Sequence, residues 1–426
     1  MKKMLLQLPF VRRLAASVIR FRDERILYNV NRAPQTASSR RALLAYIIRP
    51  FRLKPESEEF VAHQNNWAAM EIARLLGELG YIVDVINWNN HTTPIRYNYD
   101  LVIGFGRAEE LARELPSSTV KIFLSTGSQV NFTRQRLSER LADIRRWRGC
   151  ELQPVRTAPD RAEYLPYFDA IAAIGNTVTV ETYRPYFSGK IYTWNNHGYD
   201  QWIGIPPGKN FEESRRNFLY FASSGQVLVG LDLVLEVFAK RPHLRLFVCG
   251  PFAQETDFVQ CFYKELYETP NIMPVGWVVV GSEKYFELTR QCGMTIFPIC
   301  AGGSPGSVIT CMSQGLIPVV SKEAGMDTND FGITLPSIRI EDIKQAVDWI
   351  SNQPAEWHEA TNHKVLEASR RDFSQAAFTK RFHEILVSII EDKVADVSSS
   401  DKVPGYRTLF SSRKRDSEHG SFSEPL

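Results

Sequence analysis

Short turns rich in glycine and serine follow the apolar stretches of this sequence, and they are its best candidates for binding an anion. The clearest is AGGSPGS at residues 301–307, between the apolar run MTIFPI and the helical pattern SVITCMSQG. Glycine lets the backbone approach a phosphate, and the first N–H groups of a helix have no partner within the helix. Gly303, Ser304, Gly306 and Ser307 are therefore candidate phosphate ligands. An ordinary strand-to-helix turn has the same composition, so this loop alone is a weak signal.

Three further turns agree with this interpretation. Each follows an apolar run that ends in small residues: Ser224, Gly225 and Gln226 after NFLYFA, Gly250 and Pro251 after LRLFVC, and Gly276 and Trp277 after NIMPV. The carboxyl ends of parallel strands meet at one edge of a sheet, which is where open α/β sheets bind ligands. We therefore expect these turns to form one cradle for a nucleotide diphosphate.

The elements that must position these turns alternate between strand and helix patterns along most of the chain. Continuous apolar runs such as YDLVIGFG and VKIFLSTG are typical of buried parallel strands, and amphipathic stretches such as NNWAAMEIARLLGEL separate them. A break rich in proline and glycine, WIGIPPGKN, divides the pattern into two halves. The sequence therefore predicts an α/β protein with two Rossmann-like domains whose parallel sheets face each other across a cleft. The predicted boundaries are 41–205, 206–372 and a helix over 373–396 that crosses back to the first domain.

Composition narrows the classes of protein further. The 426 residues are 44% hydrophobic and 23% charged, with a net charge of +3, which excludes a collagen, a disordered chain and a coiled-coil rod. The small net charge predicts no nucleic-acid partner. No metal or cofactor site is expected, because the six cysteines form no C-x-x-C and have no histidine at zinc-ligand spacing. They are interpreted as buried free thiols, which favours a cytoplasmic location.

The two ends of the chain differ from its middle. Residues 1–25, within a segment 1–40, carry six positive charges before the first acid and an apolar stripe at helical spacing. This pattern predicts a helix that binds an anionic membrane surface as a peripheral protein does, or else one that packs on the body of the protein. No apolar stretch reaches 18 residues, so no transmembrane helix is expected. Residues 397–426 are rich in serine and charge and predict a disordered tail.

The second half resembles the donor-binding domain of family-4 glycosyltransferases, which have the GT-B fold. The residues that carry the resemblance are Gly230-Leu231-Asp232 for the K-G-L-D element, Pro274 to Trp277 for the strand end that holds the base, Phe297-Pro298, and Ser307 to Val320 for s-v-L-E-A-M-A-x-G-x-P-V-V. Asn195 to Asp200 is similar to the N-G-V-D hinge of the first half. The resemblance implies a nucleotide-diphosphate sugar as donor and a glycan or lipid-linked acceptor.

Several residues that the resemblance makes important are replaced. The cation before G-L-D, which holds the diphosphate in these enzymes, is Val229, and the two glutamates of E-x(7)-E correspond to Gly302 and Thr310. Thr310 can still bond a ribose hydroxyl, but neither residue offers a carboxylate. No D-x-D is present to bind a divalent metal, because the acids Asp327 and Asp330 are spaced differently.

Three other residues are candidates for the missing catalytic groups. Lys322 and Glu323 follow the last predicted strand, where Lys322 would supply the cation; the alternative, which the sequence favours, is that both lie in a solvated loop. His63 begins a predicted helix and is a candidate base or sugar ligand, or simply the cap of that helix. The leading hypothesis is a retaining, metal-independent glycosyltransferase of polysaccharide or glycoconjugate synthesis. The alternatives are a catalytically impaired relative that binds nucleotide or glycan or partners an active transferase, and another chemistry of the same fold, such as an epimerase or phosphorylase.

Overall fold

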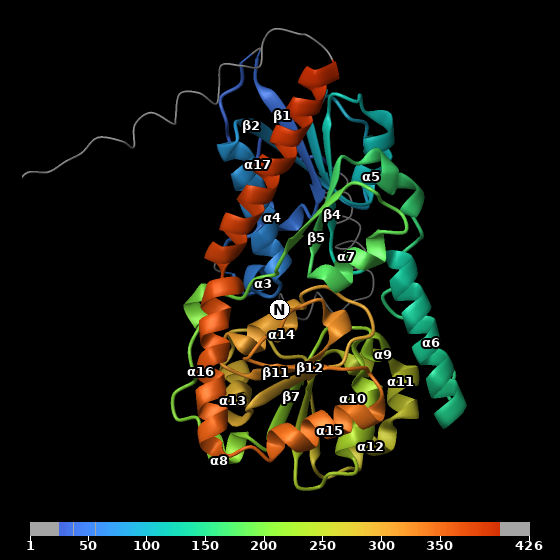
Figure 1. Ribbon diagram of the computed structural model, residues 1–426, viewed down its shortest axis with the longest axis vertical. Helices are drawn as coiled ribbons and strands as arrows, with labels where there is room; N and C mark the ends of the chain where they lie inside the picture. The colour runs from blue at the N-terminus through green and yellow to red at the C-terminus, as the bar shows by residue number, and fades with distance from the viewer. Residues whose placement is uncertain (1–24, 37, 56, 401–426) are drawn as a thin grey trace, which may run out of the picture.

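A computed structural model describes residues 25–36, 38–55 and 57–400 as two α/β domains, one above the other in Figure 1. The first domain holds a six-stranded sheet in the order β2-β1-β3-β4-β5-β6, and the second holds another in the order β12-β11-β10-β7-β8-β9. All strand pairs named in these sheets are parallel. The predicted fold class is confirmed. Residues 1–24, with most of the basic segment, and 401–426, with most of the predicted tail, lie outside the described residues.

The strands correspond to the apolar runs of the sequence. Those of the first sheet are β1 (Arg40–Tyr46), β2 (Tyr81–Asn87), β3 (Leu101–Gly104), β4 (Val120–Ser125), β5 (Ala170–Ile174) and β6 (Lys190–Trp194). Those of the second are β7 (Asn217–Phe221), β8 (Arg245–Cys249), β9 (Ile272–Gly276), β10 (Met294–Phe297), β11 (Ile317–Ser321) and β12 (Ile333–Leu335).

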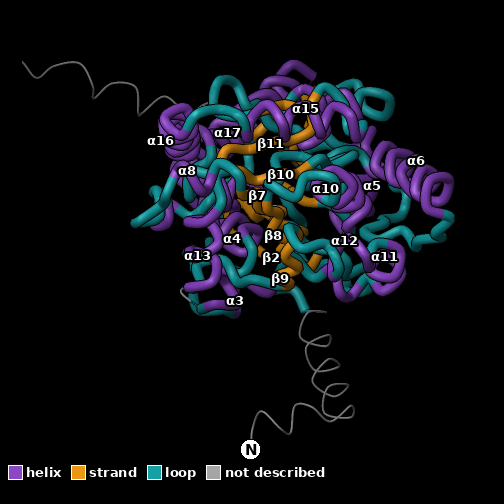
Figure 2. The backbone as a smooth tube through the Cα atoms, turned by 90° about the horizontal axis from the view of Figure 1, so that it is seen from below, coloured by secondary structure: helices purple, strands orange, loops and turns teal. Residues whose placement is uncertain are grey.

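Helices cover both faces of each sheet, as Figure 2 shows with strands in the middle and helices around them. In the first domain they are α3 (Glu58–Val61), α4 (Gln64–Glu78), α5 (Arg107–Glu114), α6 (Val130–Arg148) and α7 (Thr177–Tyr183). In the second they are α8 (Phe211–Ser214), α9 (Gln226–Val229), α10 (Leu231–Phe238), α11 (Thr256–Cys261), α12 (Tyr263–Tyr267), α13 (Glu283–Gln291), α14 (Gly306–Met312), α15 (Ile340–Ser351) and α16 (Ala355–Asp372).

Strand β1 shows why the strands are apolar throughout. Leu44 packs into the core on one face of the sheet, and its neighbours Leu43 and Ala45 pack into the core on the other face. Successive side chains of a strand point to opposite faces, so a sheet covered on both sides needs apolar residues at every position. The continuous apolar runs in the sequence follow from this arrangement.

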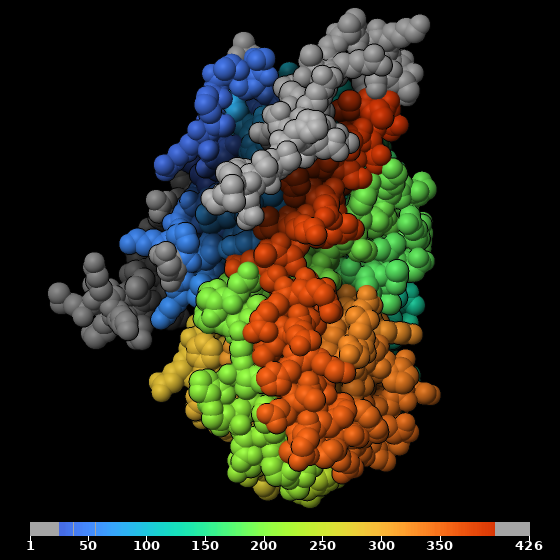
Figure 3. Space-filling view, turned by 60° about the vertical axis from the view of Figure 1, so that its left-hand side comes forward, coloured from blue at the N-terminus to red at the C-terminus, as the bar shows by residue number. Residues whose placement is uncertain are grey.

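The last helix, α17 (Gln375–Ser400), returns from the second domain to the first, where it packs on the face formed by Leu44 and α4 (Figures 1 and 3). Phe378, Phe382 and Ile385 lie on its buried side, at the helical spacing predicted from the sequence. The helix extends to Ser400, beyond the predicted end at residue 396. No helix within the described ranges is long and apolar enough to cross a membrane.

Helix α6 also joins the two domains. It begins after β4 in the first domain and runs down along the second domain in Figure 1, on the side of α9 and α11. The buried guanidinium of Arg140 pairs there with Asp232 of α10, and Arg148 pairs with Glu236 of α10 and Glu265 of α12. Asp232 of the G-L-D element therefore anchors this helix.

The interpretation of all six cysteines as free thiols is wrong for two of them. Cys150 and Cys261, 111 residues apart, form a disulfide, with a distance of 6.0 Å between their Cα atoms. The other four are free and buried, as expected. The spacing of the cysteines in the sequence does not predict this pair. The two residues meet only because α6 packs against the second domain.

Candidate functional site

A cavity of about 410 Å³ lies between the two domains, at the carboxyl ends of strands from both sheets. Its volume is within the range of small-ligand sites. Eight of the predicted residues line it: His63, Gly250, Trp277, Gly303, Ser304, Gly306, Ser307 and Thr310. Seven do not: Ser224, Gly225, Gln226, Pro251, Gly276, Lys322 and Glu323. The lining residues within the described ranges include no Asp, Glu or Lys, so these residues offer no negative side chain to repel an anion.

The loop 301–307 forms both a wall of this cavity and a contact between the domains. The backbone N–H and the hydroxyl of Ser128 each donate to the carbonyl of Gly302, at 2.8 and 2.7 Å. A Cβ on Gly303 would lie 2.4 Å from the carbonyl oxygen of Ile174, so only glycine allows this approach. The hydroxyl of Ser304 is buried and accepts from the N–H of Asn196 at 3.0 Å. The glycines of this loop are therefore explained in part by domain contact.

The turn at the start of α9 does not offer free amides to a phosphate. The carboxylate of Glu255 accepts from the N–H of Gly225 at 2.6 Å and from the N–H of Gln226 at 3.0 Å. The side chain of Gln226 is buried, accepts from the hydroxyl of Tyr220 and donates to the carbonyl of Ser223. An internal carboxylate thus occupies the position where a phosphate was expected.

Lys322 and Glu323 also lie outside the cavity. The one-turn helix Lys322–Ala324 after β11 leaves Lys322 exposed to solvent. It turns the buried carboxylate of Glu323 toward α6, where one oxygen lies 3.7 Å from the guanidinium of Arg136. The position of this turn relative to α6, which the sequence does not show, decides the direction of both side chains.

His63 lines the cavity and caps α4. Its Nδ1 accepts from the N–H of Asn65 at 3.2 Å, so the neutral ring carries its proton on Nε2. His63 is exposed toward the cavity, but the protein around its ring desolvates it; this desolvation, and then the nearby charge of Arg156, lower the pKa of His63, which keeps the ring neutral at neutral pH. In this tautomer His63 can donate to an oxygen of a ligand, but it has no free ring nitrogen to accept a proton.

Two polar residues that line the cavity were not among the candidates of the sequence analysis. Gln64, the first residue of α4, donates to the carbonyl of Gly306 at 2.7 Å and to the hydroxyl of Thr310 at 2.6 Å. Arg156, in the loop between α6 and β5, is the only Arg or Lys that lines the cavity among the residues that the structure describes. Gln64 follows His63 in a polar stretch that could have suggested it. Nothing around Arg156 in the sequence distinguishes it from other loop arginines.

Aromatic and aliphatic side chains form the remaining wall on the second domain. Trp277, which follows β9, is 59% exposed, and Phe221, Val278 and Val280 line the cavity near the same strand ends. An exposed indole at the mouth of a cavity offers a flat surface on which a nucleobase can stack.

No protein-family model matches the sequence, and a search of curated proteins gives no significant match. Solved structures do match. Sucrose-phosphate synthase from Thermosynechococcus elongatus has a TM-score of 0.59 at 12% identity, over 83% of this chain and all of the other. Anabaena Alr3699/HepE, solved in complex with UDP and glucose, has a TM-score of 0.53 at 11% identity, over 82% of this chain and all of the other. The trehalose-6-phosphate synthase OtsA has a TM-score of 0.54 at 10% identity, over 83% and 99%.

The chain has the GT-B fold. The neighbours are glycosyltransferases. The match covers nearly the whole length of each neighbour and extends over both domains of this chain. At these identities the likeness establishes the GT-B architecture and leaves the activity to be argued from the site.

Proposed function

We propose that this protein is a glycosyltransferase that takes a sugar from a nucleotide-diphosphate donor and passes it to a hydroxyl of a glycan or lipid-linked acceptor. The observation that carries this proposal is the interdomain cavity, whose described lining combines an exposed indole, an arginine and a neutral histidine and includes no acidic side chain. In the reaction the bond between the anomeric carbon and the diphosphate breaks, a bond to the acceptor oxygen forms, and the acceptor proton leaves to the diphosphate or solvent. Membrane-proximal action through residues 1–25 is part of this proposal.

We propose further that the transfer retains the anomeric configuration and needs no metal, in line with the resemblance to family 4. The test is a transfer and donor-hydrolysis assay with UDP-, GDP- and ADP-sugars, with and without a chelator, followed by NMR of the product's anomeric proton. Turnover that survives chelation and gives a retained linkage supports the proposal. Inversion, or complete loss of activity with the chelator, contradicts these two features.

The second candidate is a relative that binds a nucleotide or glycan without transferring a sugar. It is favoured by the lack of a carboxylate among the described residues that line the cavity, and by the carboxylate of Glu255, which accepts from the first amides of α9. Calorimetry that detects nucleotide binding without turnover, in the native protein and in Gly302→Glu, supports this candidate. Val229→Lys is unsuitable for restoring a cation, because Val229 is fully buried in the core of the second domain.

A further inference from the structure

The loop between α6 and β5 belongs to the first domain, and it carries an arginine to the interdomain cavity. Arg156 adopts a left-handed backbone conformation, with φ of 63°, and its side chain lines the cavity. Its Cδ and Cγ would lie 2.8 and 3.2 Å from a Cβ on Gly225, so the side chain crosses directly over the turn that begins α9. No hydrogen bond or ion pair joins Arg156 to another residue in the part of the chain that the structure describes.

The charge of Arg156 acts on both sides of the cavity. After desolvation, its charge is the second cause that lowers the pKa of His63 in the first domain, and the carboxylate of Glu255 in the second domain attracts it. Arg156 also lines one cavity together with His63 of the first domain and Gly250 of the second, so it is placed to bind a ligand held between the domains. A guanidinium is well suited to this, because it donates two parallel hydrogen bonds to phosphate oxygens.

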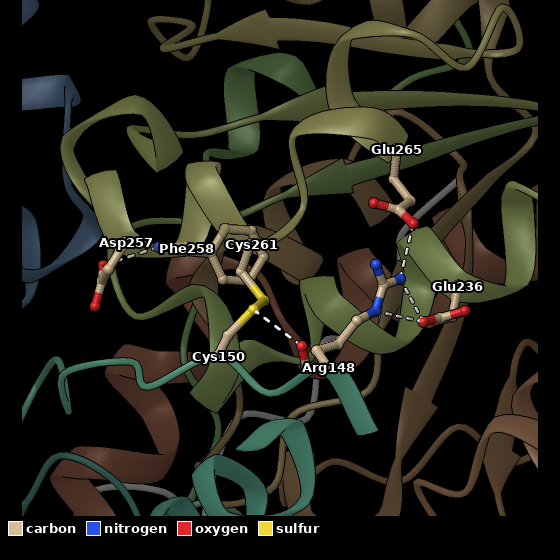
Figure 4. The surroundings of a disulfide bond; sticks show 7 residues. All are labelled: Arg148, Cys150, Glu236, Asp257, Phe258, Cys261 and Glu265. Carbon is tan, nitrogen blue, oxygen red and sulfur yellow. Dashed lines mark hydrogen bonds and ion pairs between the residues drawn. A yellow bond between two sulfur atoms is a disulfide. The ribbon is translucent and has the colours of Figure 1, made fainter. Parts of the chain in front are cut away.

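The disulfide fastens this loop to the second domain. Helix α6 ends at Arg148 and is capped by Gly149, and the next residue, Cys150, is bonded to Cys261 at the end of α11 (Figure 4). Three residues later the N–H of Gln153 donates to the carboxylate of Asp257, also in α11, at 2.7 Å. Arg156 follows after three more residues.

The far end of the loop is fixed in the first domain. The carboxylate of Asp160 accepts from the side-chain amide of Asn131, near the start of α6, and from the N–H of Ala162. The loop thus runs back beside α6 from a covalent anchor on one domain to a hydrogen-bonded anchor on the other. Arg156 lies between the two anchors, where only a short segment is free to move.

We propose that Arg156 is the cation for the donor diphosphate and that the Cys150–Cys261 disulfide positions it, so that the first domain supplies the charge that Val229 does not. This inference rests on the proposed function, since it assigns a residue to the diphosphate of the same donor. It makes the disulfide a positioning element of donor binding as well as a link between domains. A covalent anchor six residues from Arg156 preorganises the loop, and preorganisation reduces the entropy lost on binding.

The experiment is calorimetry with UDP, GDP and ADP, followed by competition with the matching nucleoside of the tightest binder. Arg156→Ala should weaken binding of the diphosphate about 10- to 100-fold and leave the nucleoside unchanged, because only the diphosphate meets the guanidinium. Arg156→Lys should restore part of the affinity. Arg145→Ala removes a charge at the exposed end of α6, where Arg145 pairs with Glu151, and serves as the matched control.

The role of the disulfide is tested by the pair of substitutions Cys150→Ser and Cys261→Ser in one protein. This variant should bind the diphosphate about 3- to 10-fold more weakly, and the loss should vanish when Arg156→Ala is also present, because the bond acts through Arg156. If the serine variant does not fold, Asp257→Ala loosens the second anchor and should give a smaller loss with the same dependence on Arg156.

The outcomes separate the inference from the function on which it rests. If none of the three diphosphates binds, the proposed donor is wrong and this inference fails with it. If one binds and Arg156→Ala binds it equally, only the inference is overturned. If the loss from breaking the anchor is the same with and without Arg156, the disulfide has no positioning role.

Discussion

The buried carboxyl of Glu109 predicts how the stability of this protein depends on pH. Glu109 lies in the first turn of α5, is 6% exposed, and lines a smaller cavity in the first domain with Phe123 and Tyr183. Burial raises the pKa of Glu109 to about 7, against the opposing charge of Arg161, whose guanidinium lies 3.4 Å away. One carboxylate oxygen of Glu109 has no hydrogen-bond partner among the described residues.

The size of the effect follows from this pKa. In the unfolded chain the pKa of Glu109 is near 4.5, so between pH 4.5 and 7 the folded protein binds more protons than the unfolded chain. The contribution of Glu109 to the free energy of unfolding is therefore full below about pH 4.5 and is lost as the pH rises through about 7. The loss amounts to about 3 kcal/mol near pH 8 and remains below about 1 kcal/mol near pH 5. The variant Glu109→Gln has no ionisable group at this position, so it should not show this pH-dependent loss of unfolding free energy.

Urea denaturation followed by tryptophan fluorescence measures this difference at several pH values. The neighbouring Glu110→Gln is the matched control, with the opposite sign. Burial would raise the pKa of Glu110, but hydrogen bonds from Arg107 and His91 outweigh it and lower the pKa. Its stabilising contribution is present above the unfolded pKa and is lost as the pH falls, so Glu110→Gln should be the less stable variant at neutral pH. Parallel pH curves for the native protein and Glu109→Gln would refute the reasoning.

Three further changes test the site and the contact between domains. Trp277→Ala should weaken nucleotide binding by about 1–3 kcal/mol in calorimetry without changing the melting temperature, because the indole is largely exposed; equal affinity would show that the base binds elsewhere. Gly303→Ala should lower the free energy of unfolding by about 1–3 kcal/mol and increase the radius of gyration in X-ray scattering, because the new Cβ meets Ile174; no change in either would contradict this contact. Arg140→Met should cost about 3–5 kcal/mol in urea denaturation, because it leaves the buried carboxyl of Asp232 without its partner, and a loss below about 1 kcal/mol would argue against that ion pair.

Local patterns in the sequence were sufficient for the architecture and for part of the cavity. Strand β10 and the glycines after it were predicted together because an apolar run followed by small residues is a property of adjacent residues. The same holds for Trp277 after β9 and for the buried face of α17. The departures at Gly302 and Thr310 are equally visible in the sequence, and both residues do line the cavity.

The sequence by itself determined two parallel sheets and the strand ends at which a ligand can bind, because apolar periodicity and turn residues act over a few neighbouring positions. Only the tertiary structure decided which charges meet at that place. The carboxylate of Glu255 accepts hydrogen bonds from the amides at the start of α9, and Glu323 turns toward α6. Arg156 of the first domain lines the cavity. Each of these outcomes depends on how segments far apart in the chain pack together. The direction of a side chain at such a contact depends on the surfaces of both packed segments. A pattern of neighbouring residues in the sequence therefore does not predict it.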